Sequence, residues 1–496
     1  MKNSSSIISS KGQILNSLND DDVIIPRSVK FITNDLLNDE EDGDEGVDLL
    51  SNTEDNENSD MNSDLKSSKQ QTRLSTIGSI VNTMMGTTIV ALPFGLAESG
   101  IGAGLLIIAI LGAVSCFTCL VVVESTPRVI EFSKTVKRFL GIHTQLLAWV
   151  ISVAIILGAA IIYHILMQET LFALVTTVMS SFGASSALTV WRREYAALVP
   201  FLLLYPVSCL KDLSALIRFN SFGFLFLTYV IIFIASHGVT VVSNLNTAPI
   251  EFVTSQGATD PLYSPNGSLR LVLLSTPNFA SLGGMMMLSF FLHNCIQPIV
   301  KNANPVTRRT DVIVAYCIAA SLYASVGVLG YFGFADAHSK SDCQAPLGSS
   351  TSLCLLKSNF LAMFAQDLSN KAAAYTLSAR AALLLQLFTV FPLLLLIIRT
   401  QVFSLVYGTE WPSASKVYLI NLLVCAITFT FAAQDLSVSE VMRFVGAGGG
   451  FVIVFAVPAA MDYIWHKREG KLSTIRIGLD ILVVLVGLSF LVMQFV

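Results

Sequence analysis

The sequence predicts an all-α polytopic membrane protein with about 11 transmembrane helices. Of the 496 residues, 53% are hydrophobic and 13% are charged, whereas soluble domains carry about 25% charged residues. The mean hydropathy is +0.67. Several apolar runs exceed 20 residues without Asp, Glu, Lys or Arg, and about 20 apolar residues suffice to cross a bilayer. These observations exclude a water-soluble globular protein.

The first 74 residues differ from the rest of the chain. They hold 16 of the 34 carboxylates and 7 of the 30 Lys and Arg residues, and they are rich in Ser, Asn and Asp. Such a segment buries too little apolar surface to fold, so we expect residues 1–74 to be a disordered acidic cytosolic tail. It lacks the basic and apolar regions of a secretory signal peptide. Within it, Glu45-Gly-Val-Asp-Leu49-Leu50 is either an acidic dileucine sorting signal or a chance match.

Residues 75–496 are predicted to form one transmembrane domain. The third apolar run is ambiguous, because residues 144–190 carry a single acid, Glu169, and could form one long helix or two. Two helices would reverse the orientation of everything that follows. With one helix, the predicted spans lie near residues 75–97, 102–124, 145–175, 195–212, 219–240, 271–297, 311–334, 379–398, 416–433, 440–463 and 477–496.

Loop charges and loop chemistry favour 11 spans. In that topology, 15 Lys and Arg residues of this domain lie on the cytosolic side and eight on the other, as the positive-inside rule requires. The Asn266-Gly-Ser268 sequon and the polar loop with Cys343 and Cys354 then share the non-cytosolic side. We therefore predict glycosylation of Asn266 and a disulfide between Cys343 and Cys354.

Two function classes are disfavoured. No Lys/Arg cluster of the kind that neutralises nucleic-acid phosphates occurs in the sequence. The six His residues are scattered, and the sequence lacks Gly-x-Ser-x-Gly, P-loop and His-Glu-x-x-His motifs, so we expect neither an enzyme nor an organic cofactor.

Helix-breaking residues recur in spans one and six. Span one contains Asn82, Gly86, Thr87 and Pro93, and span six contains Gly283-Gly284. The two spans lie five apart, which is the offset expected for two inverted five-helix repeats whose first helices unwind around a substrate site. The alternative is that these small residues only allow close helix packing.

An amino acid suits such a break. Half-helix N-termini offer N–H groups to its carboxylate, and half-helix C-termini offer carbonyl groups to its ammonium group. Oxygen atoms of Asn82 and of Thr389 in span eight could also bind a sodium ion. The alternative for Thr389 is a hydrogen bond to its own helix backbone.

Other polar residues inside spans have competing interpretations. Glu169 is either a functional buried acid, with Tyr163 and His164 one to two turns before it, or an acid that reaches water at a helix end. His293 and Asn294 in span six either hold a gate by hydrogen bonds or pack as ordinary helix residues.

Three stretches give the chain its resemblance to a known family. They are Asn82-Thr-Met-Met-Gly-Thr-Thr88, Phe290-Phe-Leu-His-Asn-Cys295, and Thr389-Val-Phe-Pro392 with Arg399-Thr-Gln401. On these residues the chain resembles the amino acid/auxin permease family and, within it, the sodium-coupled neutral amino acid transporters. It is most similar to the lysosomal arginine-sensing member. The resemblance covers about residues 73–496.

The resemblance implies a fold of two inverted five-helix repeats (LeuT-like) plus an eleventh helix, with alternating access and broken helices one and six. It assigns substrate binding to Thr83, Met84, Gly86 and Thr87. Sodium coupling in the wider family maps onto Asn82 and Thr389. Phe94 stands where the relatives tend to have Trp, a change that would alter the size of the pocket.

The tail departs from the resemblance. In the arginine-sensing relative the N-terminal segment binds the Rag–Ragulator complex, and residues 1–74 contain no match to that segment. Our interpretation is a secondary amino acid transporter of a lysosomal, late endosomal or vacuolar membrane, or alternatively of the plasma membrane, that exports amino acids to the cytosol with sodium or proton coupling. The alternative function is an amino acid sensor that signals through its tail.

Overall fold

The fold is helical and is known here from a computed structural model. It describes residues 71–125, 132–183, 190–211, 213–246, 250–255, 268–301, 303–340, 358–364, 371–409, 411–434 and 436–495. Ser67–Arg399 and Ala414–Val496 form one compact unit, and Thr400–Ser413 group apart from it. The contacts discussed below lie within the larger unit. The tail signal at Glu45, the Asn266 sequon, and Cys343 and Cys354 fall outside the described residues.

Each predicted span contains helix in the described residues. Among the described residues, eight helices are long and apolar enough to cross a membrane, and the pair α4–α5, bent by 62°, makes a ninth. In chain order the elements are α4 (Arg73–Met84), α5 (Thr88–Ser99), α6 (Ile101–Ser125), α7 (Phe132–Ser181), α9 (Arg193–Ser208), α10 (Leu213–Ser243), β1 (Ile250–Ser255), β2 (Leu269–Ser275), α11 (Phe279–Ser289), α12 (Ile296–Val300), α13 (Arg308–Lys340), the 3₁₀ helix η1 (Phe360–Met363), α14 (Lys371–Tyr407), α15 (Ala414–Ala432), α16 (Val438–Gly450), the π-helix η2 (Phe451–Ala456), α17 (Val457–Arg468) and α18 (Thr474–Val492).

The two remaining predicted spans are short. The fourth corresponds to α9, with 16 residues, and the sixth to α11 and α12, with 11 and 5 residues. At 1.5 Å per residue, α9 is about 24 Å long, a little less than the hydrocarbon core of about 30 Å. The sixth predicted span, by contrast, is a pair of helix fragments, α11 and α12.

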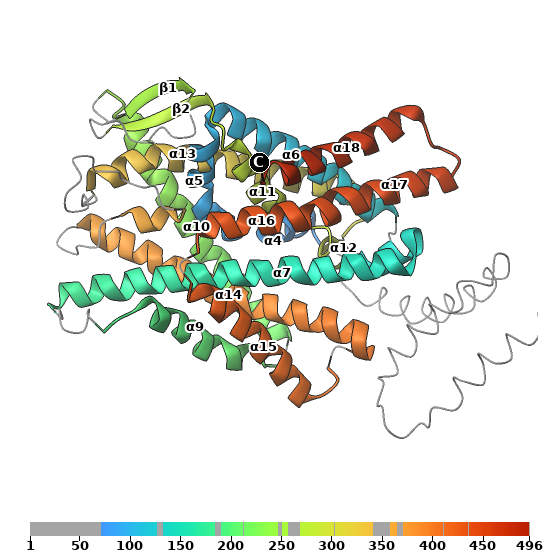
Figure 1. The fold of residues 1–496 in the computed structure, drawn as a ribbon, viewed down its shortest axis with the longest axis horizontal. Helices are drawn as coiled ribbons and strands as arrows, with labels where there is room; N and C mark the ends of the chain where they lie inside the picture. The colour runs from blue at the N-terminus through green and yellow to red at the C-terminus, as the bar shows by residue number, and fades with distance from the viewer. Residues whose placement is uncertain are drawn as a thin grey trace, which may run out of the picture. The chain divides into compact units, whose positions relative to one another are not determined.

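The third apolar run forms a single helix. α7 is interrupted only at Gly141, near its start, where φ is 80°. The alternative of two helices after residue 144 is therefore excluded. α16 packs on one side of α7, whereas α9 and α15 pack on the other (Figure 1).

Two short strands were not predicted. β1 and β2 pair in parallel, with Ile250 opposite Leu269 and Val253 opposite Val272. The strands lie beside the ends of α5 and α13 in Figure 1. The prediction that span six begins at residue 271 is thus wrong, because residues 269–275 form β2 and the helix starts at Phe279. Apolar content alone does not distinguish a buried strand from the start of a helix.

The prediction of a break at Gly283-Gly284 is also wrong. Both glycines lie inside α11 and are buried. A Cβ atom on Gly284 would overlap the carbonyl oxygen of Arg443, and one on Gly446 would overlap the carbonyl oxygen of Gly284. These glycines bring the backbones of α11 and α16 into contact, so the packing alternative holds for them.

Replacing Gly446 by alanine is expected to destabilise the protein by about 1–3 kcal/mol, because the new methyl group meets backbone that cannot rotate away. The thermal midpoint of the detergent-solubilised protein measures this. Gly448 is the matched control, since a Cβ atom there meets nothing within 4 Å. Equal midpoints for the two alanine variants would contradict the close contact of α11 and α16.

Candidate functional site

The first predicted span is broken where its sequence predicts. α4 ends at Met84 and α5 begins at Thr88. Met85 has extended backbone, with φ −76° and ψ 102°, and Thr87 is the N-cap of α5. Gly86 lowers the cost of leaving the helix, and the neighbouring hydroxyl and amide side chains compete with the helical ladder. The break leaves peptide groups of residues 85–87 outside either helix.

The sixth predicted span is broken as well, at a different place from the predicted one. α11 ends at Ser289, α12 begins at Ile296, and residues 290–295 between them are not helical. The break therefore falls on the Phe290–Cys295 stretch, six residues after the paired glycines.

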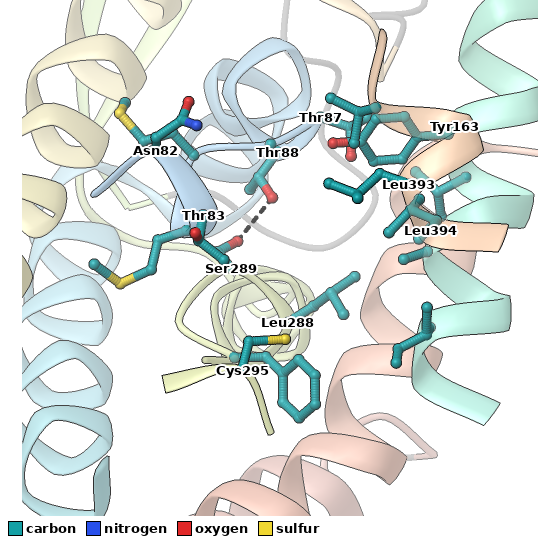
Figure 2. A pocket seen from close by; sticks show the side chains of 18 of the residues that line it. Asn82, Thr83, Thr87, Thr88, Tyr163, Leu288, Ser289, Cys295, Leu393 and Leu394 are labelled. Carbon is teal, nitrogen blue, oxygen red and sulfur yellow. Dashed lines mark hydrogen bonds between the residues drawn. The ribbon is translucent and has the colours of Figure 1, made fainter. Parts of the chain in front are cut away.

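One tyrosine connects the two breaks. The hydroxyl group of Tyr323 in α13 donates to the carbonyl oxygen of Met84 at 2.7 Å, and the carbonyl oxygen of Ser289 lies 3.3 Å away. Both carbonyls stand at the C-terminal ends of helix fragments, where intrahelical donors are missing. The side chain of Ser289 also donates to the Thr88 hydroxyl at 2.9 Å (Figure 2).

The breaks border a cavity of about 210 Å³. Figure 2 shows Asn82, Thr83 and Thr88 across the cavity from Tyr163, with Leu288 and Cys295 below them. The lining residues come from α4, α5, α7, α10, α11, α14 and the two breaks. They are Asn82, Thr83, Met84, Met85, Gly86, Thr87, Thr88, Ile155, Ile156, Ala159, Ile162, Tyr163, Gly223, Phe224, Leu227, Leu288, Ser289, Phe291, Asn294, Cys295, Gln386, Val390, Leu393, Leu394 and Ile397.

None of these lining residues is charged. The Tyr163 hydroxyl lies over the first break, 3.2 Å from where a Cβ atom of Gly86 would stand. It hydrogen-bonds to the Gln386 side chain and to the backbone of Thr87. The Oε1 atom of Gln386 is buried and has no hydrogen-bond partner among the described residues. The cavity thus combines apolar walls with uncharged polar groups, which suits a small ligand without net charge.

Comparison with known families agrees with this site. The family model described as "Transmembrane amino acid transporter protein" matches residues 69–341, more than half of the chain. The chain belongs to the transmembrane amino acid transporter family. The match includes both breaks and the Tyr323 contact that joins them. Membership identifies this protein as a transporter rather than an enzyme, and the amino acid/auxin permease resemblance is confirmed.

Named relatives of this transporter are neutral amino acid transporters. A Caenorhabditis elegans protein named "Sodium-coupled neutral amino acid transporter 9 homolog" is 26% identical over 485 residues, covering 85% of this chain and 73% of the relative. The "Neutral amino acid transporter 9" of Rattus norvegicus is 26% identical over 474 residues, covering 85% of this chain and 78% of the relative.

Two solved structures share the fold of the transporter. The inward-facing conformation of Mhp1 matches with a TM-score of 0.51 and 11% identity, over 86% of this chain and 90% of Mhp1. The complex of MhsT with L-phenylalanine matches with a TM-score of 0.50 and 12% identity, over 86% of this chain and 99% of MhsT. The predicted LeuT-like all-α membrane fold is confirmed.

The residues predicted to bind substrate gather at the cavity. Thr83, Met84, Gly86 and Thr87 all line it, and the Thr83 hydroxyl donates to the carbonyl oxygen of Ser79 at 2.8 Å. Their role in binding remains a prediction.

The two residues predicted to bind sodium have different surroundings. Asn82 lines the cavity. Thr389 is buried beside the cavity-lining face of α14, and its hydroxyl donates to the carbonyl oxygen of Gln386 at 2.7 Å. This bond is the backbone interaction named as its alternative, and it leaves the oxygen lone pairs free to accept.

The polar residues within the sixth span's break hydrogen-bond to neighbouring helices. His293 Nε2 lies 2.9 Å from the Thr118 hydroxyl of α6, and Asn294 Nδ2 donates to Ser152 of α7 at 3.2 Å. These contacts tie the non-helical segment to α6 and α7. They agree with the predicted hydrogen-bonding role, whereas gating itself stays a prediction.

The three polar residues singled out in the third span do not act together. Tyr163 faces the cavity, as described above. His164 is buried with both ring nitrogens bonded, Nδ1 to Thr428 Oγ1 at 3.0 Å and Nε2 to the Ala197 carbonyl oxygen at 2.9 Å. Glu169 is half-buried and accepts from Asn359 Nδ2 at 3.3 Å. His164 therefore serves the packing of α7 against α9 and α15.

A short segment around η1 fills space between α5, α7 and α13. Its anchor is Arg380 of α14, whose side chain is 2% exposed. The guanidinium group donates to the carbonyl oxygens of Leu361 at 3.1 Å and Phe364 at 3.0 Å, and to the Thr177 hydroxyl at 3.3 Å. These bonds satisfy the carbonyl groups of the segment and fix it against α7.

Replacing Arg380 by alanine is expected to raise amide hydrogen exchange in residues 358–364 by about tenfold or more, because each lost hydrogen bond to a charged donor contributes about 1.5–3 kcal/mol. Hydrogen–deuterium exchange mass spectrometry measures this. Arg309 is the control, since it is largely exposed and its ion pair among the described residues is the 3.4 Å contact with Glu124. Unchanged exchange in both variants would contradict the anchoring role of Arg380.

Several cavity residues were missed by the sequence analysis. Gln386, Ile155 and Leu227 have no local pattern that marks them, because each is one more polar or apolar residue in a long helix. Only the packing of α7, α10 and α14 around the first break brings them together.

Proposed function

We propose that this protein is a secondary active transporter that carries neutral amino acids from the lumen of a lysosomal, late endosomal or vacuolar compartment to the cytosol. The observation that carries the proposal is the uncharged cavity at the break between α4 and α5. Support also comes from relatives named neutral amino acid transporters. The plasma membrane is the alternative location, which organelle fractionation with a tagged chain would test.

The backbone at the break offers the contacts that every amino acid needs. The start of α5 presents N–H groups to a carboxylate, and the end of α4 presents carbonyl groups to an ammonium group. We propose Thr83, Met84, Gly86 and Thr87 as the binding residues. These contacts involve only the α-carboxylate and α-ammonium groups of the substrate. The other residues that line the cavity therefore determine which substrate side chains fit.

Those walls favour an apolar substrate side chain. Ile155, Ile156, Phe224, Leu227 and Leu393 contribute aliphatic and aromatic surface. A cationic or anionic side chain would enter this cavity without a counter-charge, which is costly. Leucine, isoleucine, methionine and phenylalanine are therefore the expected substrates, with arginine and glutamate as poor ones.

Sodium is one proposed coupling ion, with Asn82 and Thr389 as ligands. The name of the Caenorhabditis elegans relative includes sodium coupling, and both side chains provide neutral oxygen atoms at or beside the cavity. Asn82→Ala and Thr389→Ala should each weaken sodium stimulation of uptake while leaving sodium-free uptake measurable. Sodium stimulation unchanged in both variants would reject this assignment.

The test is uptake of a panel of labelled amino acids into proteoliposomes that contain the purified full chain, with and without sodium and pH gradients. Saturable flux of apolar amino acids supports the proposal. Specific binding without flux would reject it in favour of an amino acid sensor that reports through its tail to cytosolic partners such as the Rag–Ragulator complex. Absence of both would reject the amino acid site itself.

A further inference from the structure

A buried ion pair lies where α17 and α18 meet, away from the cavity-lining residues. Asp462 of α17 is 0% exposed. Its two carboxylate oxygens accept from Arg476 of α18, at 2.7 Å from Nε and 2.9 Å from Nη2. His466 lies one turn further along α17 and contacts the Asp462 backbone oxygen at 2.9 Å. The bidentate geometry satisfies the Asp462 charge.

A second carboxyl group beside this pair has no donor. Asp480 stands one turn after Arg476, the partner of Asp462, on α18 and is 6% exposed. Both of its carboxylate oxygens are buried and lack a hydrogen-bond partner among the described residues. Burying an ionised carboxylate without a partner costs several kcal/mol, so the arrangement calls for something that neutralises it.

The charges around Asp480 do not balance. Asp462 and Asp480 carry two negative charges, and Arg476 carries one positive charge. Glu124 of α6 is paired with Arg309 at 3.4 Å. His466 is the remaining titratable group of the cluster, and its Nδ1 atom is directed at Asp462.

The other elements packed against α18 add no charge at this level. α11 and η2 contain no titratable side chains, and α16 contains Glu440 and Arg443. Arg443 donates to the carbonyl oxygen of Gln494, which lies about 21 Å along the helix from Asp480 at 1.5 Å per residue. Asp462, Asp480 and Arg476 taken alone therefore leave one net negative charge.

We propose that Asp480 and Asp462 form a proton-binding site of the transporter, in which a proton taken from water resides on Asp480 and the resulting O–H group donates to the Asp462 carboxylate. Two carboxylates that lie beside the same arginine disfavour full ionisation of both and hold a proton well. A metal ion fits less well, because the described residues contain no group of three or more side chains suited to binding one. The role of this site in transport rests on the proposed function. Proton binding by the site does not, since it can be measured separately.

The position of the site explains how its occupancy could affect transport. α17 continues from α16 through the π-helix η2, and π-helical turns often occur at functional positions. Phe455 of η2 packs on α18 at Gly487, and α16 contacts the broken sixth span through Gly446 and Gly284, as described above. A change of charge between α17 and α18 would thus alter the packing of η2 and α16, and α16 contacts α11 in the broken sixth span.

The transport test uses the full chain in proteoliposomes, at constant sodium, with a labelled apolar amino acid outside and a pH dye inside. Asp480→Asn removes the titratable group and keeps the volume. It should abolish stimulation of uptake by a pH gradient and the accompanying proton movement, while exchange of internal for external amino acid persists. Asp311→Asn is the matched control, because Asp311 is equally buried but fully paired, with Arg73 at 2.8 Å and Thr307 at 2.9 Å.

A second measurement does not depend on flux. Infrared difference spectroscopy of the purified protein should show the carbonyl band of a protonated carboxylic acid near neutral pH that disappears at alkaline pH. This band should be lost in Asp480→Asn and kept in Asp311→Asn. It can also be sought in the wild-type protein alone, should the Asp480 variant fail to fold.

The contrary results would overturn either the proton site or the transport function. Absence of the infrared band in the wild-type protein, or its persistence in Asp480→Asn, would overturn the proton site. Gradient stimulation that survives in Asp480→Asn, or a loss of sodium dependence instead of pH dependence, would overturn it as well. Infrared evidence for the proton in a protein without flux would support the site and reject the transport function.

Discussion

Replacing Thr87 by tryptophan is expected to reduce saturable amino acid uptake to background. Thr87 caps the start of α5, is 6% exposed and lines the cavity. An indole ring at this position would occupy much of a cavity of about 210 Å³ and cover the N–H groups proposed to bind the substrate carboxylate. Uptake of labelled leucine into proteoliposomes measures the effect.

The control for this variant is Thr430→Trp. Thr430 is an exposed threonine of α15 whose hydroxyl donates to its own helix at 2.8 Å, so the same bulk is added away from the cavity. Full uptake by a well-folded Thr87→Trp protein would remove the first break from the substrate path.

Replacing Tyr323 by phenylalanine is expected to lower both stability and uptake. The change deletes one hydroxyl group that serves the carbonyl oxygens of Met84 and Ser289, at 2.7 and 3.3 Å. Leaving a buried acceptor without its donor costs about 1–3 kcal/mol. Because both acceptors belong to the broken helices, the geometry of the cavity should loosen along with the fold. Thermal unfolding and the Michaelis constant of uptake measure the two effects.

Tyr418→Phe is the matched control, since Tyr418 is half exposed on α15 and lies outside the cavity. A Tyr323→Phe protein with the thermal midpoint and Michaelis constant of the wild type would show that the two breaks do not depend on this bridge.

The first break could be predicted from sequence because its signal is local. Gly86 and the flanking Asn and Thr residues weaken the helix where they stand, and residues 85–87 are where it ends. Gly283 and Gly284 of span six are also small residues in an apolar segment, but they allow close helix packing instead of ending a helix. Gly284 contacts the backbone of α16. The sequence alone does not distinguish a glycine that allows close helix contact from one that ends a helix.

The residues that form the walls of the cavity could not be predicted from the sequence, for a different reason. They come from helices far apart in the chain, and an isoleucine that faces the cavity has the same sequence pattern as one that faces lipid. The Gln386 oxygen, which has no partner in the part of the chain that the structure describes, and the bridge made by Tyr323 both depend on neighbours that only the tertiary fold supplies. The strands β1 and β2 were missed because an apolar run of seven residues fits either a strand or the start of a span.

The length of α7 has a consequence for how the protein withstands extraction from its membrane. Beyond Gly141 the helix continues to Ser181, about 60 Å at 1.5 Å per residue. At a tilt of about 20°, some 21 residues cross the hydrocarbon core, which is about half of this length. α7 is therefore about twice as long as one crossing requires, and its final turns bring it to the η1 segment.

Those final turns carry the contacts with Asn359 and Arg380 that hold the η1 segment. The η1 segment is thus held by α7 and α14 rather than by lipid. Exchanging the bilayer for a detergent micelle should leave this region intact while disturbing lipid-facing helices such as α18. Detergent extracts are consequently suitable for raising conformation-specific antibodies against the η1 segment.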